Sequence, residues 1–166
     1  MIGYIVEISH SSYIGFLVQE NSDSKVKIFL NTSPKPLDEI TEEFQSFENV
    51  QITKEIPEPI QEIAKKIALI KQGFDQDLSY VSLDLTGYSE KQVQVIKTAM
   101  TIPVNEIWPY SKVAEIAGLP RAQRFVGTTM RVLRQPYIVP VQRVKSLSYI
   151  RKKERSDKRN YKRMPI

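Results

Sequence analysis

The first 31 residues consist of short apolar runs separated by polar turns. Residues 4–8, 13–20 and 25–30 are rich in β-branched and aromatic side chains, which favour extended strands. Pro34 and Pro36 end this pattern. The N-terminal region is therefore predicted to contain a small sheet.

After residue 36 the apolar spacing becomes helical. The run "LDEITEEFQSF" predicts an acidic amphipathic helix, and "VQIT" predicts a further short strand. A second helix is introduced by Pro57 and Pro59, has apolar residues at helical spacing from Ile60 to Ile70, and is ended by Gly73. Strands and helices together predict an α+β domain over residues 1–79, and residues 72–83 are the expected connector.

A further helix is expected from Ser89, whose hydroxyl can cap the helix while Gln92 reaches back to the chain before it. Its predicted buried stripe is Val93, Ile96, Ala99 and Met100.

The segment "PYSKVAEIAGLPRAQRFVGTTMRVL" has the pattern of two helices joined by a tight turn. The first is expected over residues 110–117, Gly118 stops it, and Pro120 opens the second. Two helices around a glycine-containing turn predict a helix-turn-helix.

The second of these helices has one apolar and one basic face. The core-facing positions are predicted to be Ala122, Phe125, Val126, Thr129, Met130 and Leu133. Arg121, Arg124, Thr128 and Arg131 fall on the opposite side, beside Gly127, whose missing side chain permits close approach of another molecule. A solvated surface face is the alternative, but arginines on the second helix of a helix-turn-helix favour DNA.

Two further segments end the chain. "IVPVQRV" predicts a strand, with Val139 and Val144 in the core and Arg143 held by a salt bridge or hydrogen bonds. Residues 151–166 hold eight Lys/Arg and predict a mobile or weakly helical tail. Either this tail is solvated and idle, or it adds phosphate contacts.

Charge divides the chain. The net charge is +5, but Met1–Tyr88 holds 7 Lys/Arg against 14 Asp/Glu, whereas Ser89–Ile166 holds 17 against 5. A basic half indicates a polyanionic partner, and nucleic acid is the commonest one. The carboxylates Asp38, Glu39, Glu42 and Glu43 read as a solvated helix face that keeps DNA away from the acidic half.

Composition also excludes several kinds of chemistry. The chain has no cysteine and a single histidine, His10, so disulfides, thiolate or His-rich metal sites and a cysteine nucleophile are excluded. No cofactor or metal is expected. No apolar run is long enough to span a bilayer and no signal peptide is evident, so we expect a soluble, cytoplasmic, nucleoid-associated protein with no membrane partner.

Three ordered motifs resemble the alkylguanine-DNA alkyltransferases, the methylated-DNA-protein-cysteine methyltransferase family, and its alkyltransferase-like relatives. "IPVNEIWPYSKVAEIAG" is similar to the family's IPxGExxSYxxLAxxxG, "PRAQRFVG" to PxAxRxVG, and "VPVQRV" to IPCHRV. The resemblance covers residues 83–144. It implies a small ribonuclease-H-like N-terminal lobe (residues 1–79), a mostly helical winged helix-turn-helix DNA-binding domain (80–150) and a basic tail (151–166).

The family's DNA-contacting residues map onto this chain one at a time. Tyr110 falls on the tyrosine that presses on a phosphate to rotate the target nucleotide, although an ordinary half-buried aromatic residue is as good an interpretation. Arg124 falls on the arginine that fills the hole left by the flipped base, where a guanidinium can stack and donate hydrogen bonds. A phosphate clamp is the alternative for Arg124. Gly127 falls on the glycine that lets the helix sit close in the minor groove.

The departures lie in the former active-site pocket. Val141 replaces the alkyl-accepting cysteine and Gln142 the histidine that activates it, so no nucleophile is present. Leu133 replaces a supporting asparagine, and the loop that closes over the base is shortened to "KSLSY", where Tyr149 is the one candidate for its tyrosine. Pro140 is retained.

The sequence therefore predicts a monomeric, non-catalytic alkyltransferase-like protein that binds double-stranded DNA and flips or senses a damaged base. A lesion-independent architectural DNA-binding protein is one alternative. An adaptor that recruits a repair or chromatin protein through the N-terminal lobe is another, and an active alkyltransferase is the least favoured.

Overall fold

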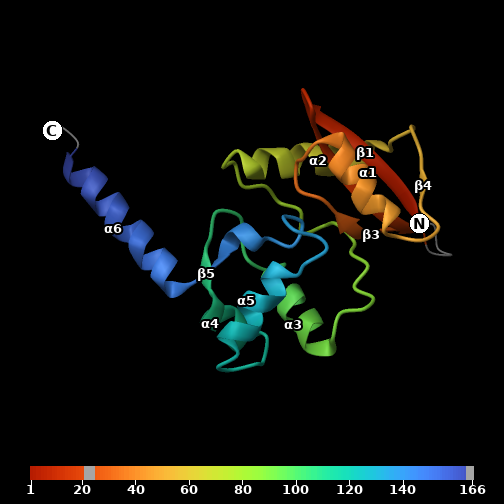
Figure 1. Cartoon of the computed structure of the whole chain (residues 1–166). Coiled ribbons are helices and arrows are strands. Elements are labelled where there is room, and N and C mark those ends of the chain that lie inside the picture. Colours follow the sequence, from red (N-terminus) through yellow and green to blue (C-terminus); the bar gives the residue numbers. More distant parts are fainter. Residues whose placement is uncertain (21–24, 164–166) are drawn as a thin grey trace. The chain divides into compact units, whose positions relative to one another are not determined.

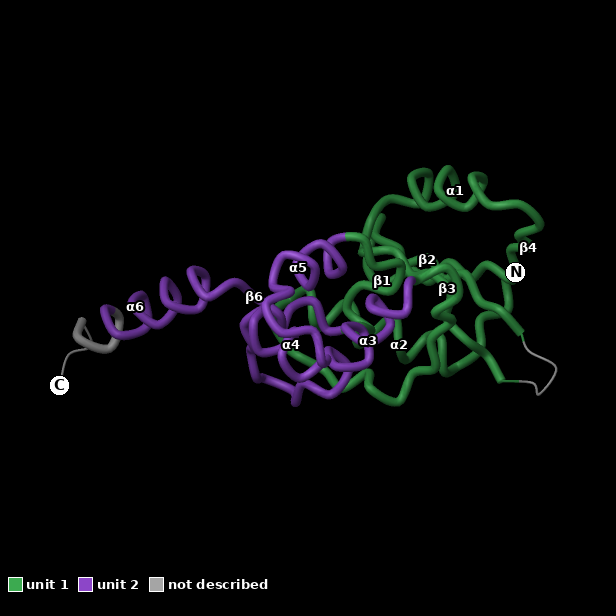
Figure 2. The backbone as a smooth tube through the Cα atoms, turned by 90° about the horizontal axis from the view of Figure 1, so that it is seen from below, with its two compact units in different colours: residues 1–88, 132–139 green, residues 89–131, 140–166 purple. Residues whose placement is uncertain are grey.

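A computed structural model of the chain describes residues 1–20 and 25–163, with side chains described as far as Arg159. The chain forms two compact units (Figure 2). Unit 1 comprises residues 1–88 and the returning segment 132–139, and unit 2 comprises residues 89–131 and 140–166. The boundary at 88/89 differs from the predicted one at 79/80, and Leu133 lies in unit 1 although it was assigned to the C-terminal domain.

Unit 1 is built on a four-stranded sheet with strand order β3-β2-β1-β4 (Figure 1). Its strands are β1 (Ile2–Ser9), β2 (Ser12–Glu20), β3 (Val26–Asn31) and β4 (Gln51–Ile52). The first three are antiparallel neighbours, whereas β4 runs parallel to β1. All four predicted strands are confirmed.

Two helices complete unit 1, α1 (Leu37–Gln45) and α2 (Glu58–Lys71). Helix α1 buries Ile40 and Phe44 against the sheet. The fit is close at Gly15 of β2, where an added Cβ would lie 2.6 Å from Ile40 Cγ2, so a larger residue would have to displace the side chains of α1. Helix α2 ends at Lys71 and is followed by Gly73, whose φ of +97° suits glycine.

The returning segment 132–139 is held in unit 1 by Arg134 and Gln135. The Arg134 guanidinium lies between the rings of Phe29 and Tyr88, 4.2 and 4.3 Å from their centroids. The fully buried Gln135 donates from Nε2 to the carbonyl oxygens of Ile28, Phe29 and Asp84 and accepts from the Tyr88 hydroxyl. An apolar side chain could not satisfy these groups, so the two polar residues make segment 132–139 part of this unit.

Unit 2 is mostly helical. Its elements are α3 (Glu90–Ala99), β5 (Trp108–Pro109), α4 (Tyr110–Ile116), α5 (Gln123–Arg131), the 3₁₀ helix η1 (Val141–Arg143), β6 (Val144–Lys145) and α6 (Leu147–Arg163). Strands β5 and β6 pair in parallel. The predicted α+β fold, a small sheet lobe followed by a helical region, is confirmed.

Helix α3 has the predicted capping box. The Gln92 backbone N–H donates to Ser89 Oγ, and Gln92 Oε1 accepts from the Ser89 backbone N–H. The predicted stripe is half right, because Ile96 and Ala99 are buried but Val93 is only half-buried and Val95 lies in the core instead.

Residues 147–163, including most of the predicted tail, form the helix α6, which agrees with the helical alternative of the prediction. The last residues of that tail, 164–166, lie outside the described residues. Within residues 1–20 and 25–163, no helix has both the length and the hydrophobicity needed to cross a bilayer.

Candidate nucleic-acid interface

Helices α4 and α5 follow each other across a short turn, in the segment for which a helix-turn-helix is predicted. Helix α4 ends at Ile116 and is followed by Gly118, which has a φ of +77°. The Gly118 and Leu119 N–H groups donate to the carbonyls of Glu115 and Ala114. Helix α5 begins at Gln123 and not at Pro120 as predicted. The reason is local: Arg121 has a positive φ of +67°, which no helix allows, so it lies in the turn.

Helix α5 has a buried face and an exposed one, as its periodicity predicts. Val126 and Thr129 are buried, and the Thr129 hydroxyl donates to the Phe125 carbonyl at 2.8 Å. The other predicted core positions are half-buried: Ala122, Phe125, Met130 and Leu133. One side of the helix therefore fixes it within unit 2.

The opposite side of α5 carries Arg124, Thr128 and Arg131, and Arg121 lies in the turn before the helix. We call these four residues the arginine face. All four residues are exposed. Among the described residues, no carboxylate forms an ion pair with any of the three guanidiniums. Their charge is therefore available to an external anion.

Gly127 does not join the arginine face. It is buried, and a Cβ added to it would lie 3.2 Å from Cε2 of Tyr110. The close approach that this glycine allows is that of the half-buried Tyr110 ring, at the first residue of α4. Within the protein the space beside Gly127 is thus occupied by Tyr110, and contact of Gly127 with another molecule stays a prediction.

Val141, which the resemblance aligns with the family's acceptor cysteine, lies in η1 and not in the predicted strand. Pro140 has φ −76° and ψ +71°, and the chain after it turns for three residues before pairing in β6. Val141 and Gln142 are half-buried in this turn. The buried Arg143 donates from Nη1 to the Ile102 carbonyl at 2.8 Å, which confirms its predicted structural hydrogen bonding.

The other predicted pocket residues come from different elements of the chain. Leu133 belongs to unit 1. Tyr149 lies on α6 and is 46% exposed, with Lys145 Nζ 5.2 Å from its ring centroid. Val139 and Val144 are buried, as predicted.

One exposed cation near the helix-turn-helix was missed in the sequence. Lys112 of α4 holds its ammonium 4.3 Å from the Trp108 ring centroid. The tryptophan four residues earlier in "WPYSK" was the available signal, because a cation and an indole at this spacing can meet.

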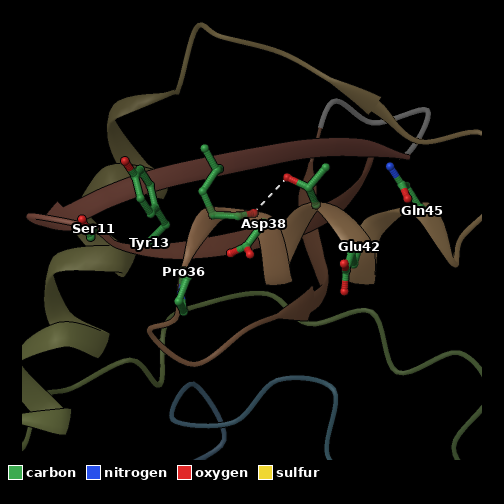
Figure 3. A pocket seen from close by; sticks show the side chains of 8 residues that line it. Ser11, Tyr13, Pro36, Asp38, Glu42 and Gln45 are labelled. Carbon is green, nitrogen blue, oxygen red and sulfur yellow. Dashed lines mark hydrogen bonds between the residues drawn. The ribbon is translucent and has the colours of Figure 1, made fainter.

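Unit 1 carries a surface of the opposite charge. A pocket of about 710 Å³ lies beside α1 and the β1–β2 turn (Figure 3). It is lined by Ser11, Tyr13, Pro36, Leu37, Asp38, Thr41, Glu42 and Gln45. Asp38, Glu39 and Glu42 are exposed, whereas Glu43 pairs with Lys35. The described residues contain no group of three or more His, Asp or Glu able to hold a metal ion.

Comparisons with known proteins agree with this arrangement. Residues 90–162 match the family described as 6-O-methylguanine DNA methyltransferase, DNA binding domain. No curated protein matches the chain.

Solved structures show the same fold over most of the chain. A Mycobacterium tuberculosis OGT, solved in complex with DNA, is 20% identical, with 89% of this chain and 80% of that chain covered and a TM-score of 0.62. An O6-methylguanine-DNA methyltransferase from the archaeon Pyrococcus kodakaraensis is 13% identical, with 87% and 86% covered and a TM-score of 0.60. The chain thus has the fold of these proteins, and its residues 90–162 match the DNA-binding domain of the 6-O-methylguanine DNA methyltransferase family.

Proposed function

We propose that this protein binds duplex DNA through the arginine face and does not transfer alkyl groups. The observation that carries the proposal is a set of three exposed guanidiniums, Arg124 and Arg131 on α5 and Arg121 in the turn before it, within a segment that matches a DNA-binding domain. Among the described residues, no carboxylate pairs with them. Guanidiniums contact phosphates and base edges bidentately, and the opposite face of α5 holds the helix in place. A location at the nucleoid is part of the same proposal.

The absence of transfer rests on chemistry. An acceptor must offer a lone pair, and Val141, at the family's cysteine position, has only methyl groups. Gln142 cannot act as the general base that histidine would supply. The Arg143 hydrogen bond to Ile102 and the buried Val144 support a structural role for this segment.

Within this function, Tyr110 and Arg124 are the candidates for rotating a nucleotide and filling the space it leaves. Tyr110 is backed by α5 at Gly127, so its ring rests on a rigid support. Arg124 is exposed on that helix. Unstacking a base costs a few kcal/mol, and a stacked guanidinium offsets part of that cost.

The test measures binding of the full chain to one duplex with and without a single O6-methylguanine, by fluorescence anisotropy at about 0.15 M salt. Arg124→Ala is expected to weaken binding about tenfold, or about 1.4 kcal/mol. Arg124→Lys distinguishes the two roles, because lysine keeps the charge but loses the planar fork. If Arg124→Lys keeps the affinity, Arg124 acts as a phosphate clamp. If Arg124→Lys loses the preference for the O6-methylguanine duplex, the guanidinium fills the space left in the base stack.

Gln123→Ala is the matched control, because Gln123 is exposed and uncharged on the same helix. Unchanged affinity in Arg124→Ala would refute the proposed interface. Incubation with DNA labelled on the alkyl group is expected to leave the protein unlabelled, and any transfer would contradict the non-catalytic assignment.

Equal affinity for both duplexes would favour the architectural alternative, in which DNA is held without inspection. An adaptor function is favoured by the acidic pocket beside α1, where Asp38 and Glu42 face solvent. Capture of a repair or chromatin protein that is lost in Asp38→Asn/Glu42→Gln would support it.

A further inference from the structure

Helix α6 carries its charges unevenly around its axis. At about 100° per residue, five cations fall within an arc of about 120°. We call them the α6 stripe: Arg151, Lys152, Arg155, Lys158 and Arg159. Lys153, Glu154 and Asp157 fall outside this arc. A disordered tail would have no such sidedness.

The α6 stripe is free to meet a ligand. Each of residues 151–159 is exposed. Among the described side chains, none of the five cations is paired with a carboxylate. Five like charges close together on one helix are unfavourable unless a polyanion approaches them.

We propose that the α6 stripe is a second nucleic-acid site, separate from the arginine face, that binds the phosphate backbone of duplex DNA without regard to sequence or lesion. This goes beyond the proposed function, which needs only the helix-turn-helix. Residues 151–159 span about 12 Å of helix axis at 1.5 Å per residue. The same length of duplex carries about seven phosphates, so the charge density of the stripe is comparable to that of DNA.

The composition of α6 argues against a membrane as the partner. A helix that lies on a bilayer needs an apolar face opposite its cations. Within residues 151–159, the side of the helix away from the α6 stripe carries Lys153, Ser156 and Asp157. These nine residues include no apolar side chain, although Leu147, Tyr149 and Ile150 precede them and Tyr161 follows them in the sequence of the helix.

The test compares the salt dependence of duplex binding by the full chain and by Arg151→Gln/Arg155→Gln/Lys158→Gln/Arg159→Gln. Glutamine is a good helix former, so α6 is expected to persist, which circular dichroism checks. Each lost phosphate contact lowers the slope of log K against log salt concentration by about 0.9, so we expect the slope to become shallower by about 3.6. An undamaged duplex is the probe.

The matched control removes four exposed cations from unit 1: Lys25→Gln/Lys54→Gln/Lys65→Gln/Lys71→Gln. It has the same net charge as the stripe variant and should lower the slope by less than about 1. A slope for the stripe variant within about 1 of the wild type would overturn the proposal. The proposal would also be overturned if the stripe substitutions weakened binding to phosphatidylserine vesicles or polyglutamate more than they weakened binding to DNA.

The two proposals fail separately. In an Arg121→Gln/Arg124→Gln/Arg131→Gln background, the residual duplex affinity should depend on the α6 stripe. If that background binds like the wild type, the arginine face is refuted while the stripe stands. If the stripe variant keeps its slope but the arginine-face variant loses affinity, the stripe is refuted alone.

Discussion

Gly127 and Tyr110 show how a single missing side chain shapes the candidate interface. A glycine inside a helix costs about 1 kcal/mol relative to alanine. Here that cost accompanies the seating of the Tyr110 ring, 3.2 Å from where a Cβ would be. The two residues are therefore expected to be energetically coupled.

Gly127→Ala should lower the free energy of unfolding by about 1 kcal/mol, because the new methyl group displaces the Tyr110 ring. In a Tyr110→Ala background the same change should raise that free energy by about 0.5–1 kcal/mol, since only the helix propensity remains. Urea unfolding of the four proteins gives the coupling energy. Equal effects in both backgrounds would show that Gly127 does not serve to seat Tyr110.

For single residues of the interface, the sequence predicted solvent exposure well but did not predict which side chains contact one another. Periodicity alone placed Arg124, Thr128 and Arg131 on the solvent side of α5. It could not identify the neighbour of Gly127, because that neighbour lies on another helix. Nor could it find the left-handed Arg121, since arginine carries no preference for positive φ.

At the scale of elements, capping residues were the most reliable signals. The predicted starts and stops at Ser89, Gly73 and Gly118 are all observed, because each cap satisfies its own backbone groups without help from distant residues. The run around Val141 misled for the opposite reason. An apolar stretch of this length fits a strand or a buried turn equally well, and Pro140 starts the turn.

The capping box gives an element-scale prediction. Ser89→Ala should lower the free energy of unfolding by about 1 kcal/mol, because the Gln92 N–H then loses its acceptor at the helix start. Ser89→Asp should preserve stability, since its carboxylate caps equally well. Thermal unfolding measures both variants, and a Ser89→Ala protein as stable as Ser89→Asp would contradict the capping account.

In the whole molecule, the net charge changes sign at the same position in the sequence at which unit 1 gives way to unit 2. The sign changes at residues 88/89, where the compact units meet in the sequence. With Arg134 counted in unit 1, the net charges are −6 and +11. Composition thus marked the boundary better than the apparent connector at residues 72–83. The return of residues 132–139 to unit 1 has no comparable signal in the composition. Hydrogen bonds between side chains and carbonyls more than 100 positions apart leave no local sequence pattern.

A substitution of Gln135 can test whether segment 132–139 stabilises unit 1. Gln135→Leu should lower the free energy of unfolding by about 2 kcal/mol, because the Tyr88 hydroxyl and three carbonyls lose a partner. Hydrogen exchange should speed up at the Ile28 and Asp84 amides, which bond Ser82 and Ile28 in the same unit. Gln123→Leu, on an exposed site, is the control. Unchanged exchange at Ile28 would show that segment 132–139 does not brace the sheet.

The interleaving of the two units also limits how such a protein can be rearranged. The chain passes between units at 88/89, at 131/132 and again at 139/140. Suppose that one junction at 88/89 joins residues 1–88 to the C-terminal half of another protein. Unit 1 would then receive eight foreign residues in place of 132–139, and it would lose Arg134 and Gln135. Unit 1 can therefore be transferred to another protein only if residues 132–139 are transferred with it. Residues 1–88 alone do not form an independent module.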